Sequence, residues 1–173
     1  MNMENSNFRK LEKKLSYTFI NRELLSESLR HRSFVNEQCY GWLTDNERME
    51  FLGDAVVNLI VGHSLMERFP ELKEGELSRI RASLVNESQL AEIARSLDLG
   101  SHLQLGKGEL LTQGREKNSI LADTFEAVVA AVFLDGGYKS ADLIVRQIFE
   151  PLFTGVVLQI GRASCRERVC HRV

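Results

Sequence analysis

The sequence predicts an all-α domain, and three observations support this fold class. Apolar residues recur every three or four positions along most of the chain, which places them on one face of a helix. No long stretch alternates apolar and polar residues, as a half-buried strand does. The chain has only two prolines, Pro70 and Pro151, so few positions disfavour a helix interior. We expect about seven or more helices.

A first helix is predicted near the N-terminus, because Phe8, Leu11 and Leu15 share one helical face. A second helix is predicted to begin at Asn21, whose short side chain can accept a hydrogen bond from a free amide of the first turn. Its leucines continue the apolar face toward His31.

The longest predicted helix follows a loop. Residues 33–45 are polar and contain several turn-forming residues, so we interpret them as that loop. Asn46 is then predicted to cap a long helix that ends near Phe69. Pro70 follows directly and cannot continue it. His63, inside the apolar run of this helix, is interpreted as a core histidine rather than as a base.

Two further helices are predicted in the middle of the chain. Gly75 precedes the first, which covers residues 76–85. The second begins at Asn86 and ends near Leu97, and the pair Asn86 and Gln89 has the spacing of a capping box.

The last part of the chain contains a loop and a pair of helices. Residues 99–114 are interrupted by glycines and are predicted to be a loop. Helices are predicted over residues 118–134 and 140–153. The sequence Asp-Gly-Gly at residues 135–137 is typical of a turn and separates them.

Length and composition indicate one soluble globular domain. The 173 residues suffice for one domain, and 43% hydrophobic and 27% charged residues are ordinary for this class. The longest uncharged apolar stretch, residues 55–66, is shorter than the roughly 20 residues that span a bilayer. The N-terminus has no apolar signal segment, and three cysteines cannot form a disulfide framework. We therefore expect a cytoplasmic protein with no membrane partner.

The C-terminal residues differ in composition from the rest of the chain. Residues 160–173 hold two of the three cysteines and four of the fifteen arginines. Residues 160–169 also resemble the conceptual translation of a common sequencing adapter. We interpret residues 159–173 as a non-native tail and residues 1–158 as the domain. A genuine basic tail that contacts a phosphate backbone is the alternative. Residues 1–159 carry 18 basic and 23 acidic side chains, net −5, so composition alone does not indicate a nucleic-acid-binding protein.

Two predicted helices carry carboxylates beside apolar runs. Glu50 and Asp54 are four residues apart and precede residues 55–66, which have no formal charge. Asp123 and Glu126 are three apart and precede the run AVVAAVFL. Each spacing places both carboxylates on one helix face. Because isolated buried carboxylates are unfavourable, such groups form ion pairs, bind a metal ion or take up a proton.

Two helix faces of this kind can enclose a divalent cation. Ligation by oxygen alone suits Mg²⁺ or Mn²⁺, and neither cluster contains the histidine or cysteine that zinc prefers. Gly53 favours such a site, because a glycine inside a helix often marks the close approach of another backbone.

Simpler interpretations of these carboxylates remain open. An acidic residue in the first turn of a helix opposes the helix macrodipole, which accounts for Glu47. It accounts poorly for Asp54, which lies a full turn deeper. For Asp123, the alternative is a salt bridge to Arg115 or Lys117.

Three segments together point to a known family. They are NERMEFLGDAVV at residues 46–57, EGELSRIRASLV at residues 74–85 and ILADTFEAVVAAVFLDGG at residues 120–137. The first resembles the signature of the ribonuclease III family, and the other two are similar to its further blocks, in the same order. The HRS sequence at residues 31–33 also resembles an N-terminal segment of the family. The resemblance covers about residues 8–155 and implies the all-α ribonuclease III endonuclease-domain fold, which works as a homodimer.

The resemblance also implies roles for individual residues. By this resemblance the metal ligands of the family are Glu50, Asp54, Asp123 and Glu126. Asp54 and Glu126 match the catalytic pair. Glu47 and Glu74 match two further acidic positions with supporting roles in arranging the substrate or the metal.

The activity implied by the resemblance is hydrolysis of double-stranded RNA. A water molecule attacks the phosphodiester with the help of Mg²⁺, Mn²⁺ can substitute, and no small-molecule cofactor is needed. The products have 5′-phosphate and 3′-hydroxyl ends with short 3′ overhangs, and the cellular role is in rRNA processing and in RNA maturation and turnover.

Two alternatives to a catalytic domain that has lost its RNA-binding domain remain. The bacterial enzyme usually carries a C-terminal double-stranded-RNA-binding domain where this chain has its tail, so we expect weak RNA binding, mainly at low salt. A short enzyme that naturally lacks that domain is one alternative. A non-catalytic RNA-binding or ribosome-associated protein on the same fold is the other, although such proteins typically lose one or more of the four carboxylates.

Overall fold

The structure is a computed structural model that describes residues 3–38 and 41–170, with side chains described for residues 8–38 and 41–157. The described residues form nine α-helices and one 3₁₀-helix, with no strand beyond an isolated bridge between Arg30 and Gln104. The helices are α1 (Met3–Leu15), α2 (Arg22–Ser28), α3 (Arg32–Gln38), α4 (Glu47–Arg68), α5 (Glu74–Leu84), α6 (Glu87–Ser96), α7 (Leu99–His102), α8 (Lys107–Leu111), η1 (Gly114–Glu116) and α9 (Asn118–Cys170). The predicted all-α class is confirmed.

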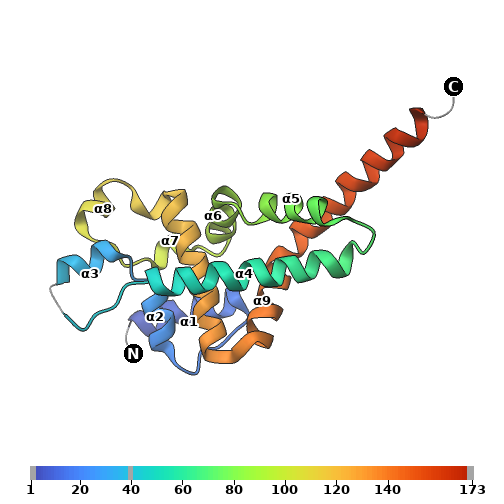
Figure 1. Ribbon diagram of the computed structural model, residues 1–173. Coiled ribbons are helices and arrows are strands. Elements are labelled where there is room, and N and C mark those ends of the chain that lie inside the picture. Colours follow the sequence, from blue (N-terminus) through green and yellow to red (C-terminus); the bar gives the residue numbers. More distant parts are fainter. Residues whose placement is uncertain (1–2, 39–40, 171–173) are drawn as a thin grey trace.

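The core lies where α4 crosses α9 (Figure 1). Helix α4 contributes fully buried aliphatic side chains such as Val57 and Ile60, and α9 contributes Phe125, Phe149 and Phe153. Helices α2 and α6 pack on α9 as well. Complete burial of one such side chain stabilises the fold by about 1.5–3 kcal/mol, so this crossing contributes substantially to the stability of the domain.

Helix α9 is interrupted at the predicted turn. Gly137 has φ 73° and ψ −179°, a conformation that strains any residue with a side chain. The Asp135 carboxylate accepts hydrogen bonds from the backbone N–H groups of Ile20 (2.9 Å) and Asn21 (2.8 Å) and from the Tyr17 hydroxyl (2.7 Å). The turn is thereby fastened to the connection between α1 and α2.

Two segments predicted to be loops contain short helices. Residues 33–45 were expected to be irregular, but α3 covers their first part, while residues 39 and 40 lie outside the described residues. Helix α3 packs against α8, and its Phe34 and Val35 are half-buried. Residues 99–114 likewise contain α7 and α8. Helices this short depend on tertiary packing for stability, which a polar composition does not reveal.

Two of the predicted helix caps are confirmed. The Asn21 side chain accepts a hydrogen bond from the Glu23 N–H at 3.1 Å at the start of α2. The Asn86 side chain accepts one from the Gln89 N–H at 3.0 Å at the start of α6. Each bond satisfies one of the free amide groups of a first helical turn.

The third predicted cap, at Asn46, is wrong in its chemistry. The Asn46 side chain is buried and donates a hydrogen bond to the Ser28 carbonyl at 3.2 Å. At the start of α4, the Asp45 carboxylate accepts the hydrogen bond from the Glu47 N–H at 3.2 Å instead. Asn46 therefore joins α4 to the end of α2 rather than capping its own helix.

The two longest helices differ from expectation in extent or character. Helix α9 continues to Cys170 instead of ending near Phe153, and its last turns project away from the body (Figure 1). The non-native origin of residues 159–173 stays a prediction, and residues 171–173 lie outside the described residues.

Helix α4 is long and apolar enough, by length and composition only, to cross a membrane, but 44% of the relevant segment is buried inside the domain. The core helix of a soluble protein meets the same criteria.

Candidate metal centre

The site is built where α4 and α9 touch through their backbones. Gly53 of α4 is buried, and a Cβ atom at this position would lie 1.9 Å from the carbonyl oxygen of Glu126 in α9. The glycine lets the two helices approach more closely than any side chain would permit. The carboxylates one turn away on each helix are consequently brought together.

Three of the predicted carboxylates share one cluster. Glu50, Asp123 and Glu126 each offer an oxygen atom, and these atoms lie within 4.8 Å of one another. All three residues are partly buried. Within the described part of the chain, none of the three forms a salt bridge. This is an arrangement of like charges that elementary electrostatics disfavours unless a cation or protons compensate it.

The structure does not support a salt bridge as the explanation for Asp123. The Lys117 ammonium group pairs with Glu109, and the Arg115 guanidinium group donates to the Gly100 carbonyl. Both basic side chains that could have neutralised Asp123 therefore have other partners. The metal-site interpretation is favoured over this alternative.

The electrostatics of the cluster agree with its crowding. Burial, followed by the charges of Asp54, Asp123 and Glu50, raises the pKa of Glu126 from 4.5 to about 8. Burial and the Asp123 charge raise the pKa of Glu50, and burial and the Glu87 charge raise the pKa of Asp123. All three shifts disfavour the charged forms. A divalent cation would favour the charged forms instead.

The donor set fits a hard divalent cation. Three carboxylates supply oxygen ligands only, the chemistry that Mg²⁺ and Mn²⁺ prefer, and water can complete the coordination sphere. Because no histidine or cysteine belongs to the cluster, zinc fits poorly. Glu50, Asp123 and Glu126 are the residues that could hold the ion.

Asp54, the fourth predicted ligand, lies outside this set of three. Its side chain is exposed and accepts a hydrogen bond from the Asn58 amide at 2.7 Å. Its charge is nevertheless the largest charge contribution to the raised pKa of Glu126, so it stands beside the cluster. Its role as a ligand stays a prediction.

A cavity of about 480 Å³ opens beside the cluster. Its lining combines two of the clustered carboxylates with residues from α3, α4 and α9, namely His31, Arg32, Asn46, Glu47, Glu50, Ile120 and Asp123. Glu47, predicted to have a supporting role, is thus placed at this cavity, where it accepts a hydrogen bond from Arg32 at 3.0 Å. No role was predicted from the sequence for His31 or Arg32. The HRS segment was the available signal.

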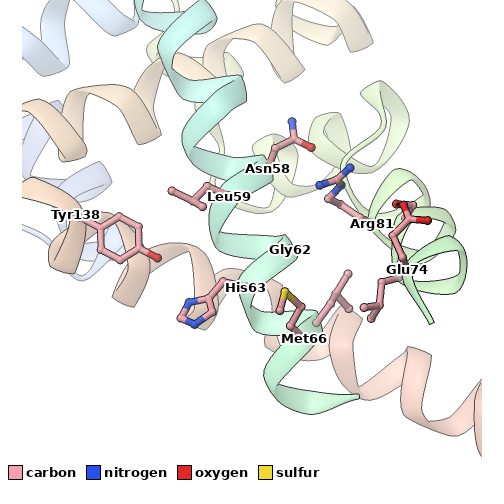
Figure 2. Close-up of a pocket in the computed structure, with 11 residues that line it drawn as sticks. Asn58, Leu59, Gly62, His63, Met66, Glu74, Arg81 and Tyr138 are labelled. Carbon is pink, nitrogen blue, oxygen red and sulfur yellow. Dashed lines mark hydrogen bonds between the residues drawn. The ribbon is translucent and has the colours of Figure 1, made fainter. Parts of the chain in front are cut away.

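Glu74, the other predicted supporting residue, lines a different pocket. This second pocket of about 710 Å³ lies along α4 and α5, with Tyr138 of α9 at its edge (Figure 2). Glu74 accepts a hydrogen bond from the Ser78 hydroxyl at 2.8 Å and does not line the carboxylate cavity. Within one chain the structure does not bring Glu74 to the cluster.

His63 also lines this second pocket, and its interpretation as a core histidine is wrong. Its side chain is 49% exposed, and its Nδ1 atom lies 3.1 Å from a guanidinium nitrogen of Arg146. Its Nε2 atom lies 3.4 Å from a carboxylate oxygen of Glu67. Part of the apolar run of α4 is exposed on the surface. The sequence does not indicate this, because the run carries no formal charge.

The fold and the cluster together define a helical domain with a carboxylate site suited to a divalent cation. The family model described as Ribonuclease-III-like matches residues 21–169. The chain is 52% identical over 147 residues to Ribonuclease 3 of Geobacter metallireducens, a match that covers 84% of this chain and 60% of that protein. It is 49% identical over 152 residues to Ribonuclease 3 of Myxococcus xanthus, which covers 88% and 58%.

A solved structure is similar as well. The nuclease domain of ribonuclease III from Campylobacter jejuni matches with a TM-score of 0.76 and 42% identity, over 82% of this chain and 95% of that one. This chain belongs to the ribonuclease III family. It spans about 60% of the length of the curated relatives described above.

Proposed function

We propose that this chain is the catalytic domain of an endoribonuclease that hydrolyses double-stranded RNA with the help of Mg²⁺. The observation that carries the proposal is the cluster of Glu50, Asp123 and Glu126, which has no ion-pair partner among the described residues. Carboxylate clusters of this kind suit metal-assisted phosphodiester hydrolysis. The proposal is supported by membership in the ribonuclease III family.

A cation bound here would polarise a phosphate oxygen and lower the pKa of a bound water molecule. The chain's own residues hold the reacting groups in place. Glu50, Asp123 and Glu126 are fixed by the backbone contact between α4 and α9 and orient the site. The role that we propose for Asp54, whose carboxylate accepts a hydrogen bond from the Asn58 amide, is to accept a hydrogen bond from the attacking water. Cleavage of the bond to the 3′ oxygen leaves a 5′-phosphate and a 3′-hydroxyl.

We also propose that the active form is a homodimer. Helix α4 exposes large apolar side chains, with Phe51 82%, Leu59 58% and Met66 64% exposed. Exposed apolar surface of this extent on one helix is typical of a protein–protein interface. The nuclease domain of the Campylobacter jejuni enzyme has a region involved in dimer formation. Two protomers would supply two carboxylate sites, one for each RNA strand, and hence staggered ends with short 3′ overhangs.

Retention of all four family carboxylates favours catalysis over a non-catalytic RNA-binding scaffold. The net charge of −5 for residues 1–159 supports weak RNA binding that falls further as salt rises. The cellular role that we propose, in rRNA processing and RNA turnover, is supported only by the membership in the ribonuclease III family.

The deciding experiment is cleavage of a long double-stranded RNA by the whole chain at low salt. Mg²⁺ should support cleavage, and the ends should carry 5′-phosphates and short 3′ overhangs when the products are sequenced. Replacement of Mg²⁺ by Ca²⁺, or the Glu126→Gln substitution, should abolish it. A matched control is Glu92→Gln, because Glu92 pairs with Arg95 on α6 and lies outside the cluster.

Cleavage that persists in Glu126→Gln would contradict the assignment of the site. Binding of the RNA without any cleavage in Mg²⁺ or Mn²⁺ would favour the non-catalytic scaffold.

A further inference from the structure

Two basic side chains line the cavity beside the carboxylate cluster. Among its lining residues, His31 and Arg32 are the only ones with a basic side chain, and they share the lining with the carboxylates of Glu47, Glu50 and Asp123. They come from the start of α3 and the residue before it. A polyanion that enters this cavity therefore meets both these two groups and the carboxylates.

The surroundings of His31 favour its neutral ring, because burial lowers its pKa. Its Nδ1 atom accepts a hydrogen bond from the Ser33 backbone N–H at 3.3 Å and lies 2.8 Å from the Ser33 hydroxyl oxygen. That hydroxyl oxygen accepts from the Gly106 N–H at 2.9 Å. A backbone N–H can only donate, so this contact favours the tautomer that has its proton on Nε2. Arg32 is then the one fixed positive charge among the residues that line this cavity.

Arg32 is held loosely and has hydrogen-bonding capacity to spare. Its Nη1 atom donates to Glu47 at 3.0 Å, and the two side chains are 63% and 52% exposed. Within residues 8–38 and 41–157, Glu47 is its only hydrogen-bond partner. A guanidinium group has five N–H donors, and an exposed ion pair contributes only about 0–1 kcal/mol. The side chain can therefore turn to another anion at little cost.

We infer that Arg32 contacts a phosphate of the RNA backbone next to the bond that the carboxylate cluster cuts. The inference rests on the proposed function. A guanidinium fork matches two phosphate oxygens, and its charge offsets the repulsion between the RNA and the carboxylates of the cavity. Glu47 holds Arg32 at the cavity until the phosphate replaces it. Arg32 thus acts as a substrate-positioning residue and not as a ligand of the cation.

The test measures RNA binding by the whole chain as a function of salt. A short double-stranded RNA is titrated with the protein at several KCl concentrations. The buffer contains Ca²⁺ in place of Mg²⁺, so that the RNA stays intact. Single-turnover cleavage with Mg²⁺ is measured in parallel. The variants are Arg32→Ala, Arg32→Gln and Arg32→Lys. The matched control is Arg9→Ala, which removes an exposed arginine of α1 that does not line the cavity.

Loss of one phosphate contact should reduce the slope of log K against log salt concentration by about one. Arg32→Ala and Arg32→Gln should show this reduced slope and weaker binding, about 3- to 10-fold at ~0.1 M salt, with the cleavage rate at saturating RNA changed less than the affinity. Arg32→Lys should keep the slope, since it keeps the charge, and Arg9→Ala should match the parent chain.

If the parent chain binds and cleaves RNA, an unchanged slope of log K against log salt concentration in Arg32→Ala and Arg32→Gln would overturn this inference alone. The Arg32 side chain would then serve only its ion pair with Glu47. A parent chain that neither binds nor cleaves the RNA would overturn the proposed function and this inference with it. The two failures are therefore distinguishable.

Discussion

Gly53 and Glu126 are in backbone contact, and this contact sets the geometry of the carboxylate cluster. A Cβ atom on Gly53 would stand 1.9 Å from the Glu126 carbonyl oxygen and 2.4 Å from its carbonyl carbon. Both neighbours are backbone atoms in a core helix, so neither can turn aside as a flexible side chain would. The missing side chain of Gly53 is what lets oxygen atoms of Glu50 and Glu126 lie within 4.8 Å of each other.

Replacement of Gly53 by alanine should therefore destabilise the fold. Alanine is intrinsically better in a helix by about 1 kcal/mol, but overpacking of a tight core costs typically about 1–3 kcal/mol. A Cβ atom only 1.9 Å from the Glu126 carbonyl oxygen would clash with it, which places this site at the upper end of that range. We therefore expect the free energy of unfolding to fall by a net amount of roughly 1–2 kcal/mol. Cleavage should fall more steeply than stability, because the helices separate at the cluster. Urea unfolding and the cleavage rate measure the two effects.

The control for this prediction is Gly155→Ala, in the part of α9 that follows the interruption at Gly137. A Cβ at Gly155 meets nothing within 4 Å, so the helix-propensity gain should appear undiminished as up to about 1 kcal/mol of added stability. Equal unfolding free energies for Gly53→Ala and the parent chain would show that the helices can separate without loss.

The sequence predicted the parts of this site that local pattern encodes. The spacing of Glu50 and Asp54 on one helix, and of Asp123 and Glu126 on another, indicates a shared site from the sequence alone. Gly53 was recognised as a point of close approach, and the approaching backbone proves to be that of Glu126 within the same chain.

The rest depended on tertiary contacts. Asp45 caps α4 in place of Asn46, because the Asn46 side chain donates its hydrogen bond to the Ser28 carbonyl of another helix. Helix α3 formed in a polar segment because α8 covers it. The position of Arg32 at the cavity follows from that packing, which no periodicity in the sequence encodes. The orientation of Asp54 toward Asn58 is likewise a side-chain choice that spacing cannot specify.

Glu126 should make the stability of the chain pH-dependent when no divalent ion is present. Its pKa rises from 4.5 to about 8 in the folded state. Between these values the folded state binds more protons than the unfolded state, so the free energy of unfolding should fall as pH rises from about 4.5 to about 8 and level off above. Thermal unfolding in the presence of a chelator, at a series of pH values, measures this slope.

The matching variant is Glu126→Gln, which keeps the shape of the side chain without the charge. Its slope over the same pH window should be smaller, and near pH 8 its Tm should exceed that of the parent chain by roughly 2–4 °C, the effect of about 1 kcal/mol. This effect is well below what the full pKa shift implies, because the cavity is open to solvent. Identical slopes would assign the pH dependence to other groups.

Divalent cations should reverse this penalty by binding to the folded state. Mg²⁺ or Mn²⁺ at about 100 times its Kd should add about 2.7 kcal/mol to the free energy of unfolding, which raises Tm by several degrees. Asp123→Asn and Glu126→Gln should lose this rise, because each removes one of the three clustered carboxylates. Glu74→Gln should retain it, since Glu74 lines the other pocket. A cation-dependent rise that survives in both cluster variants would locate the ion elsewhere.

The proposed dimer should depend on Phe51. This side chain lies on α4 and is 82% exposed, so its replacement by glutamate removes no packing within one chain but places a charge on the apolar face. Phe51→Glu should shift the chain toward monomer by 10-fold or more in dissociation constant, since burial of one aromatic side chain contributes at least about 1.4 kcal/mol to an interface. Sedimentation equilibrium measures the shift, and an unchanged Tm at low concentration shows that the monomer still folds.

The control for the dimer is Leu111→Glu on α8. Leu111 is 86% exposed, so the two variants introduce the same charge at equally accessible apolar positions on different helices. If the interface is the apolar face of α4, the Leu111 variant associates like the parent chain and only the Phe51 variant dissociates. Because each protomer would cut one strand, the Phe51 variant should also lose coupled double-strand cleavage and leave nicked duplexes. Equal dissociation of the two variants, or of neither, would place the interface away from Phe51.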